Sequence, residues 1–437
     1  MNLLPFQTAH AERIEQAILS KRVALDASEP GTGKTYVACH VAARLACPIV
    51  IVTTKATVPS WQAVAEGFGV QPIQVINYEL LRKGKQAICR RNGGIFIWNL
   101  PDDALIIFDE AQNCRGRDSL NSKMLIAARR QHHRILLCSA TAASSPLEMR
   151  SIGFTLGLHM LSDYWIWCRK HGVKEGLFGM EFRGGFEHLN AIHQAIFPLK
   201  GSRMRISEIE DFPSTLVEAT AIETGKARTI QGIYNKMKRE LKAAECTGDT
   251  EQLRQLADSL DAKKASHVTI LLRARQAVEL YKVGAMVELA KNAMQEGMSV
   301  VLLVNFNATL EALCEQLDCN AVIRGGQSES DRAASISSFQ RNETHCIVAN
   351  IQAGGVGVSL HDPSGQRPRL SLISPSFSAA ELRQALGRVH RAGGATSIQK
   401  IIFAAGTCEE HTAKICAQKL AHIDLLNDGD LSPFPIK

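Results

Sequence analysis

The chain has 437 residues, of which 45% are hydrophobic and 21% charged, and its formal net charge is +7. No apolar run approaches the ~20 residues that cross a bilayer, which excludes a membrane span. Twelve cysteines at scattered spacings, with no C-x-x-C pair, exclude a disulfide framework and a zinc ribbon. The modest positive charge suits a polyanionic partner but also an ordinary enzyme. Polar residues come too early at the N-terminus for a secretion signal, so we expect a cytoplasmic protein, in a bacterial or phage-infected cell if it is prokaryotic.

The length predicts two domains, which we place at residues 1–215 and 216–437. In the first domain, short apolar runs alternate with amphipathic helical stretches, as in a parallel sheet that is covered on both faces. The runs that predict strands are residues 22–27, 48–54, 73–77, 104–110 and 134–140.

A glycine-rich segment, S-E-P-G-T-G-K-T, follows the first expected strand and precedes an expected helix. This is the context of a phosphate-binding loop, in which Gly31 and Gly33 let backbone N–H groups face phosphate oxygens. Lys34 is expected on the β and γ phosphates of ATP, and Thr35 on Mg²⁺. Serine replaces the first glycine of the usual pattern. The predicted ATP-binding residues of the segment are Ser28, Glu29, Pro30, Gly31, Thr32, Gly33, Lys34 and Thr35.

Two carboxylates, Asp109 and Glu110, follow the uncharged strand 104–108 and begin the sequence D-E-A-Q. Parallel sheets place ligands at the carboxyl ends of their strands. We therefore expect Asp109 to hold Mg²⁺ and Glu110 to orient and deprotonate the attacking water.

Charged helix formers replace the alternating pattern between residues 226 and 275, with a break at 247–249, which predicts a helical hairpin. After Gly297 the strand and helix alternation returns, so a second α/β domain is expected. Its predicted strands are residues 299–305, 321–325, 345–350, 369–374 and 398–404.

A complete ordered series of motifs resembles superfamily 2 helicases and translocases, in particular the Swi/Snf-like branch and its small fork-remodelling and phage relatives. In chain order these motifs are L-P-F-Q from residue 4, the phosphate loop, T-T-K-A-T-V-P-S-W from 53, I-N-Y-E from 76, D-E-A-Q from 109, S-A-T from 139, V-N-F from 304, I-R-G-G from 323, A-N-I-Q-A-G-G-V-G-V-S-L from 349 and Q-A-L-G-R-V-H-R-A-G-G from 384. The resemblance implies an α/β fold of two RecA-like parallel-sheet lobes in tandem, with the helical insertion between them.

The resemblance also implies roles for residues outside the phosphate loop. Gln7 is expected to read the adenine edge, and Gln384 to reach the nucleotide or Glu110. Arg388 and Arg391 are three residues apart, which on a helix puts both guanidinium groups on one face, as fingers for the γ-phosphate. The small hydroxyl residues Ser139 and Thr141 are candidates for coupling hydrolysis to the nucleic-acid surface.

Nucleic-acid contacts should be mostly to phosphates, because a motor that moves along any sequence cannot depend on base edges. Trp61 is expected to pack its helix in preference to stacking on a base. Arg203, Arg205 and Arg275 resemble residues that brace the lobes or touch the backbone. The predicted contacts are Thr54, Lys55, Ser60, Asn305, Arg324, Gly325, Gln352, Gly354 and Gly355.

These features predict an ATP- and Mg²⁺-dependent DNA translocase or helicase that acts on forked, branched or recombination DNA as a monomer. S-A-T is typical of true helicases, so strand separation stays open, and the chain has no room for chromatin-reading modules. An RNA helicase, a nucleotide-gated clamp without productive hydrolysis, and a motor subunit of a larger complex are the alternatives.

Overall fold

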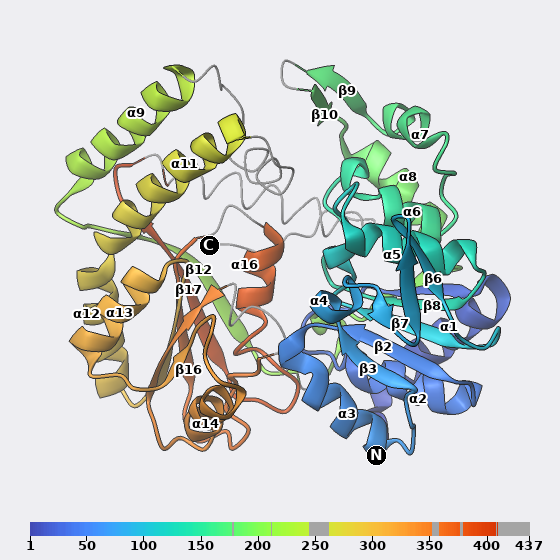
Figure 1. Cartoon of the computed structure of the whole chain (residues 1–437). Coiled ribbons are helices and arrows are strands. Elements are labelled where there is room, and N and C mark those ends of the chain that lie inside the picture. The colour runs from blue at the N-terminus through green and yellow to red at the C-terminus, as the bar shows by residue number, and fades with distance from the viewer. Residues whose placement is uncertain are drawn as a thin grey trace. The chain divides into compact units, whose positions relative to one another are not determined.

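The computed structural model describes residues 1–176, 179–210, 212–243, 262–351, 358–375, 379–407 and 409. These residues form two compact units, one that ends at Phe212 and one that begins at Pro213. Each unit is built around a six-stranded sheet (Figure 1). None of the helices in this part of the chain is long and apolar enough to span a membrane.

The sheet of the first unit contains only parallel pairings. Its strands, in spatial order, are β11 (Gly201–Ser202), β1 (Val23–Asp26), β8 (Arg134–Cys138), β7 (Leu105–Asp109), β2 (Ile49–Thr53) and β3 (Gln74–Asn77). All of these except β11 lie within the five runs that predicted strands.

Both faces of this sheet are buried, which explains why its strands are continuously apolar. Within β2, Ile49 and Ile51 pack into one hydrophobic cluster, whereas Val50 and Val52 pack into another. The first cluster is completed by α1 (Pro5–Lys21), α2 (Lys34–Leu45) and α3 (Val58–Gly67). The second is completed mainly by α5 (Leu120–Arg130), α6 (Arg150–Thr155) and α8 (Phe186–Ile196).

Two small antiparallel sheets were not predicted. One contains β4 (Lys85–Gln86), β5 (Cys89–Asn92) and β6 (Ile95–Trp98), and the other pairs β9 (Val173–Gly176) with β10 (Gly179–Phe182). The remaining short elements of this unit are α4 (Tyr78–Leu81), α7 (Tyr164–Lys170) and the 3₁₀ turns η1 (Lys55–Thr57), η2 (Ala111–Cys114), η3 (Pro146–Glu148) and η4 (Ile206–Glu208).

The sheet of the second unit is also parallel throughout. Its order is β12 (Thr215–Ile222), β17 (Ser397–Ala404), β16 (Arg369–Ile373), β13 (Ser299–Val304), β15 (Cys346–Asn350) and β14 (Val322–Ile323). Its helices are α9 (Ala227–Ala243), α11 (Ala262–Leu280), α12 (Val283–Gln295), α13 (Asn307–Leu317), α14 (Glu329–Gln340) and α16 (Ala379–Leu386). The expected pair of parallel-sheet, RecA-like lobes is therefore confirmed, although β12 was not among the predicted strands.

The charged stretch that follows β12 in the second unit forms two helices, α9 and α11, that lie side by side (Figure 1). Ile230, Tyr234 and Met237 of α9 pack against Ala274 and Val278 of α11. These apolar residues recur at helical spacing among charged ones, which is the pattern of a helix pair that buries one face. The predicted helical insertion is confirmed, while its predicted turn at 247–249 lies outside the described residues.

Candidate nucleotide-hydrolysis site

The predicted phosphate loop connects β1 to α2, and its glycines have the backbone that only glycine adopts freely. Gly31 and Gly33 have φ values of 88° and 91°. A Cβ atom on Gly33 would also lie 2.3 Å from Nε2 of Gln7. The positive φ therefore favours glycine at this position, and a side chain there would also displace the Gln7 amide. Of the neighbours, Pro30 is half-buried, Thr32 is fully buried, and Thr35 lies in the first turn of α2, which begins at Lys34.

Gln7 lies against the phosphate loop, although 25 residues separate it from Thr32. Its side-chain Nε2 donates to the Thr32 carbonyl at 2.8 Å, and its Oε1 accepts from the Leu4 amide at 2.9 Å. The residue is only 3% exposed. The structure thus brings the L-P-F-Q motif to the loop, and reading of adenine by Gln7 stays a prediction.

Lys34 directs its ammonium group into the loop, where it donates to the carbonyls of Ser28 and Glu29 at 2.8 and 3.1 Å. The Ser28 hydroxyl is fully buried and forms its contacts with residues outside the phosphate loop. It accepts from the Met204 amide at 3.0 Å and lies 3.2 Å from Nε2 of His10. In this structure the contribution of Ser28 to the site is therefore its carbonyl oxygen.

A second segment, residues 201–206, holds the loop from the other side. Arg203 donates to the Ala27 carbonyl at 2.9 Å and lies 3.6 Å from the Glu29 carboxylate. Glu29 also accepts from the Ile206 amide at 2.6 Å. Arg203 and Glu29 are both nearly inaccessible to solvent, so Arg203 acts as a brace of the phosphate loop. Arg205 instead lies 3.7 Å from the carboxylate of Glu208.

Asp109 ends β7, and three side chains from two other motifs hold it. Its Oδ2 accepts from the Thr53 hydroxyl at 2.6 Å and from Nε1 of Trp61 at 2.8 Å, while its carbonyl accepts from the Tyr78 hydroxyl at 2.8 Å. Burial, and then the charge of Glu110, raise the pKa of Asp109 to about 6. The hydrogen bonds from Thr53 and Trp61 oppose this rise by stabilising the ionised form.

Glu110 is connected to the S-A-T motif through one side-chain amide. Gln112 of D-E-A-Q donates to Glu110 Oε2 at 2.6 Å, and its Oε1 accepts from the Ser139 hydroxyl at 2.6 Å. Ser139 in turn accepts from the Thr141 amide at 3.1 Å. The predicted coupling residues are therefore joined to the predicted general base by a continuous chain of hydrogen bonds.

The predicted nucleic-acid contacts of the first unit lie at the carboxyl edge of its sheet. Thr54 follows β2, Lys55 begins η1, and Ser60 is exposed in the first turn of α3. Hydroxyl contacts link Thr54 to Thr57 at 3.0 Å and Thr57 to Thr53 at 2.5 Å. Since Thr53 donates to Asp109, this edge is connected to the carboxylate as well.

The arginine pair of the second unit was predicted on a helix, and this was wrong. Helix α16 carries Gln384 but ends at Leu386, and Arg388 and Arg391 lie in the turn that follows. Gly387, a poor helix former, comes at this point. The two guanidinium groups nevertheless converge, because both donate to the carbonyl of Val358, at 3.0 and 3.4 Å.

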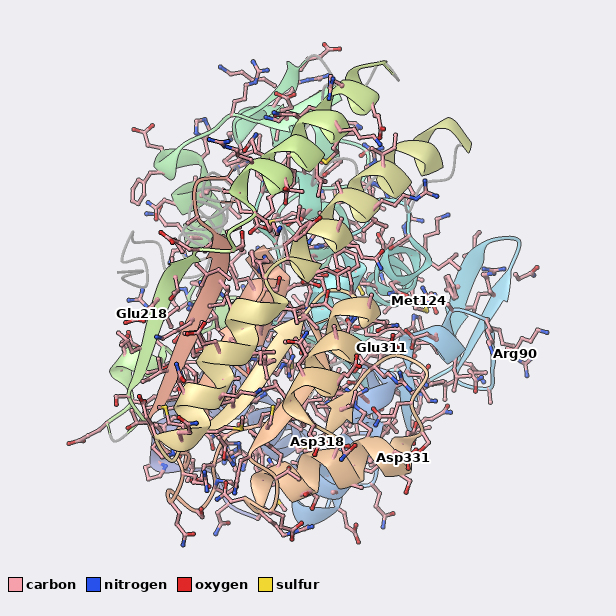
Figure 2. The ribbon with its side chains drawn as sticks, turned by 90° about the vertical axis from the view of Figure 1, so that its left-hand side faces the viewer. Arg90, Met124, Glu218, Glu311, Asp318 and Asp331 are labelled. Carbon is pink, nitrogen blue, oxygen red and sulfur yellow. The ribbon has the colours of Figure 1, made fainter. Side chains whose placement is uncertain are left out.

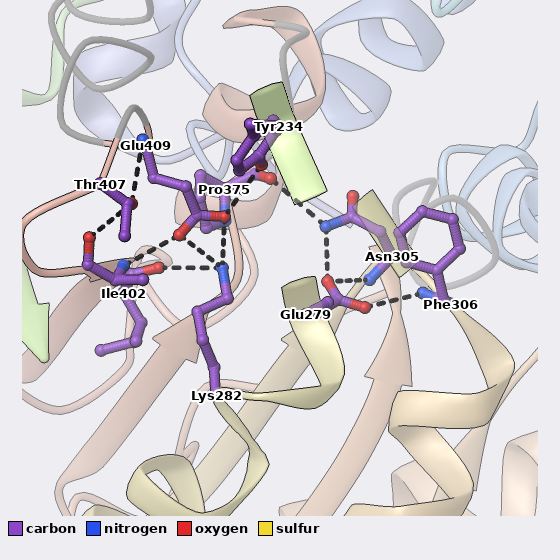
Figure 3. A network of polar contacts seen from close by, with 10 residues as sticks. Tyr234, Glu279, Lys282, Asn305, Phe306, Pro375, Ile402, Thr407 and Glu409 are labelled. Atoms are coloured by element: carbon purple, nitrogen blue, oxygen red, sulfur yellow. Dashed lines mark hydrogen bonds and ion pairs between the residues drawn. The ribbon is translucent and has the colours of Figure 1, made fainter. Parts of the chain in front are cut away.

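Among the predicted contacts of the second unit, Asn305 is held inside a buried polar network (Figure 3). Its side-chain amide donates to Glu279 at 2.7 Å and to the Pro375 carbonyl at 3.3 Å. Glu279 accepts two further bonds from the amides of Asn305 and Phe306. Arg275 lies beside this network, with its guanidinium carbon 5.9 Å from the centre of the Phe306 ring.

Of the other nucleic-acid contacts predicted in the second unit, two lie among the described residues and three do not. Arg324 is exposed and lies 3.5 Å from Glu311, and Gly325 beside it has open space around its backbone. Gln352, Gly354 and Gly355 lie outside the described residues.

The sequence analysis did not assign functional roles to Thr53, Gln112, Tyr78 or Glu279, and for Trp61 it favoured packing over stacking on a base. Trp61 is indeed buried, at 1% exposure, but its indole N–H also donates a hydrogen bond to Asp109. Only the position of Trp61 at the end of the T-T-K-A-T-V-P-S-W motif could have signalled this.

These features can be compared with one family match. Residues 281–393, in the second unit, match the family described as helicase conserved C-terminal domain. The match agrees with the motif series, which resembles that of superfamily 2 helicases.

Two particular relatives can be described. The chain is 29% identical over 475 residues to a "Putative ATP-dependent RNA helicase L364" of Acanthamoeba polyphaga mimivirus, and the alignment covers 98% of this chain and 84% of that protein. It also aligns with a solved structure, "Sulfolobus solfataricus SWI2/SNF2 ATPase core in complex with dsDNA", at 16% identity and a TM-score of 0.38, covering 98% of this chain and 94% of that one.

Proposed function

We propose that this protein is an ATP-dependent DNA translocase or helicase that acts on forked, branched or recombination intermediates. The observation that carries the proposal is the hydrogen-bonded chain from Glu110 through Gln112 to Ser139, next to a phosphate loop of the required backbone geometry. Such a chain connects the group that would activate water to a second motif. An isolated nucleotide-binding protein has no need of that connection.

The residues of the first unit fit a nucleoside triphosphate and Mg²⁺. Left-handed glycines, one lysine and a buried carboxylate at a strand end are the donor set that such a ligand requires. Residues 28–35 would hold the triphosphate, and Thr35 and Asp109 would hold the metal. Bound ATP and Mg²⁺ supply the phosphoanhydride bond and the neutralisation of its charge.

The chain's own groups then have distinct tasks. Glu110 accepts the proton of the attacking water, and Gln112 fixes the orientation of that carboxylate. Thr53 and Trp61 hold one oxygen of Asp109, so the other oxygen is left to face the site. Arg388 and Arg391 of the second unit stabilise charge that develops on the transferred phosphoryl group. Cycles of binding and hydrolysis would release and regrip the nucleic-acid backbone.

The choice of DNA follows from the Swi/Snf-like resemblance of the motifs. The second candidate is an RNA helicase, which the printed name of the mimivirus relative favours. The two are separated by comparing how single-stranded DNA, duplex DNA, forked DNA and RNA stimulate ATP hydrolysis. Stimulation by RNA alone would replace DNA with RNA as the track.

The motor proposal is tested with Lys34→Ala and Glu110→Gln, followed by strand-displacement and branch-migration assays on forked and four-way DNA. Both variants should lose nucleic-acid-stimulated ATPase activity by at least ~10³-fold, because Lys34 would hold the reacting phosphates and Glu110 would accept the proton of the attacking water. Near-normal turnover in either variant would contradict the site. A wild-type protein that binds nucleic acid with ATP but does not hydrolyse it would be a nucleotide-gated clamp instead.

A further inference from the structure

The small sheet β4–β6 of the first unit is strongly basic. Between residues 82 and 99 the sequence contains five cationic side chains and no aspartate or glutamate. The cations are Arg82, Lys83, Lys85, Arg90 and Arg91. Arg82 lies 3.8 Å from Glu79, and in the described part of the chain no acidic side chain pairs with the other four.

The two faces of this sheet differ sharply. Cys89, Phe96 and Trp98 point into the hydrophobic core of the unit. In the register of the sheet, Lys85 is opposite Arg90, and Arg90 is opposite Ile97, so these three side chains share the other face. Ile95 lies on the same face, and Ile95 and Ile97 are 68% and 49% exposed. Figure 2 shows Arg90 on this ribbon, with its side chain directed away from the core, in which Met124 lies.

Hydrogen bonds attach the sheet to helix α5, so its exposed face is held in a defined position. Trp98 donates from Nε1 to the Met124 carbonyl at 3.1 Å, and its amide donates to the Gln131 side chain at 2.8 Å. The Gln131 amide closes the contact by donating to the Phe96 carbonyl at 3.0 Å. Because the buried face supplies this anchoring, the exposed face is not needed to hold the fold.

The position of the sheet relates it to the predicted nucleic-acid contacts. Strands β2 and β3 are parallel neighbours, with Thr53 paired to Asn77 at their carboxyl ends. Thr54 and Lys55 follow the first strand, and the path to β4 follows the second through α4. The basic sheet therefore emerges from the same edge of the lobe as the predicted contacts.

We propose that the exposed face of β4–β6 binds duplex nucleic acid, with Lys85 and Arg90 on the phosphates and Ile95 and Ile97 against the end of the base-paired region. The proposal rests on the proposed motor function and adds a second contact to it. Cations that lack acidic partners complement a phosphate backbone. Single-strand binding surfaces stack bases on aromatic side chains, but both aromatic residues here face the core. Exposed aliphatic side chains instead suit a wedge at a base step.

The phosphate contacts are tested with the double substitution Lys85→Ala and Arg90→Ala in the full chain. Binding is measured without nucleotide, against a blunt duplex, a fork and a single-stranded oligonucleotide. We expect duplex and fork affinity to fall by about tenfold, with much less effect on the single strand. The slope of log K against log salt should become shallower by about 2, since two phosphate contacts are lost. The matched control is Lys21→Ala with Lys170→Ala, two exposed cations elsewhere in the same unit.

The aliphatic contact is tested with Ile95→Ser and Ile97→Ser. Affinity for the fork should fall while the salt slope stays that of the wild type, because no charge is removed. Unchanged duplex affinity in the basic variant, or an equal loss on all three nucleic acids, would overturn the proposal. Since these assays contain no ATP, they also separate it from the motor function: a loss of duplex binding stands even if Lys34→Ala and Glu110→Gln were to hydrolyse ATP normally.

Discussion

Glu110 combines a strained backbone with a predicted catalytic task. Its φ of 49° is left-handed, a conformation that costs a residue with a side chain about 1–3 kcal/mol when the surroundings impose it. Directly before it, Asp109 is held from outside by Thr53, Trp61 and Tyr78. The strain turns two successive carboxylates in different directions, so that one faces the threonine and tryptophan while the other reaches Gln112.

The buried carboxyl of Asp109 should make the stability of the metal-free protein depend on pH. Its pKa is raised from 3.8 to about 6, so the folded state binds the proton more tightly than the unfolded chain. This contribution to stability is full at low pH and is lost as the pH rises through about 6. Asp109→Asn should therefore gain about 3 kcal/mol relative to the wild type between pH 3 and pH 7. Thermal unfolding with a chelator measures this, and the exposed Asp103→Asn is the control. A difference that does not change with pH would refute the assignment.

Ser139 should matter for coupling and not for nucleotide binding. Ser139→Ala removes the donor to Gln112 and leaves the Thr141 amide without its acceptor, so Glu110 loses its indirect support. We expect stimulated ATPase turnover to fall about tenfold, with the Kd for ATP unchanged, as one lost hydrogen bond of ~1.5 kcal/mol implies. Thr155→Val removes an equally buried hydroxyl that donates to the Ser151 carbonyl and is not a member of this chain of hydrogen bonds, and it should not change turnover. A weaker ATP affinity in Ser139→Ala would instead assign it to the binding site.

At the scale of elements, strand β11 and the residues after it hold the phosphate loop in place. Arg203→Ala should destabilise the protein by about 3 kcal/mol, because it leaves the Glu29 carboxylate buried without its cation. Arg183→Ala removes an exposed partner of Glu181 and should cost less than about 1 kcal/mol. Chemical denaturation compares the two variants. Equal small effects would mean that the Glu29 carboxylate does not depend on Arg203.

Elements that carry their own signal were predictable from the sequence. The strands of both lobes are continuous apolar runs because both faces of each sheet are buried. The glycines of the phosphate loop indicate the positive φ values that the loop requires. The sheet β4–β6 was not predicted, since its strands are short and interrupted by Gly93 and Gly94 in a run of charge. The end of α16 was missed although Gly387 marks it, because the spacing of Arg388 and Arg391 fitted a helix equally well.

The contacts inside the site could not be predicted in the same way. Thr53 and Trp61 reach Asp109 across 56 and 48 residues, and no local pattern encodes a partner at that separation. Resemblance to a family supplied the motifs, but not which hydroxyl or indole each carboxylate would meet.

At the scale of the whole molecule, the two units divide the predicted work. All the predicted triphosphate and metal ligands belong to the first unit, while Arg388 and Arg391 belong to the second. Arg391→Ala should therefore leave the Kd for a nonhydrolysable ATP analogue within about twofold of the wild type, and reduce turnover by about 10³-fold or more. Arg341→Ala, an exposed arginine of the same unit paired with Glu343, is the control. Loss of nucleotide affinity together with turnover would place Arg391 in binding instead of catalysis.

The parallel pairing of β1 with β11 has a consequence for biosynthesis. Ser28 and Met204 are joined by a hydrogen bond across 176 residues, and the Glu29 carboxylate contacts Arg203 and the Ile206 amide. A ribosome delivers these groups long after it has made the glycine loop. Translation intermediates arrested before residue 206 should therefore fail to retain nucleotide, and the loop becomes competent only when almost the whole first lobe has emerged.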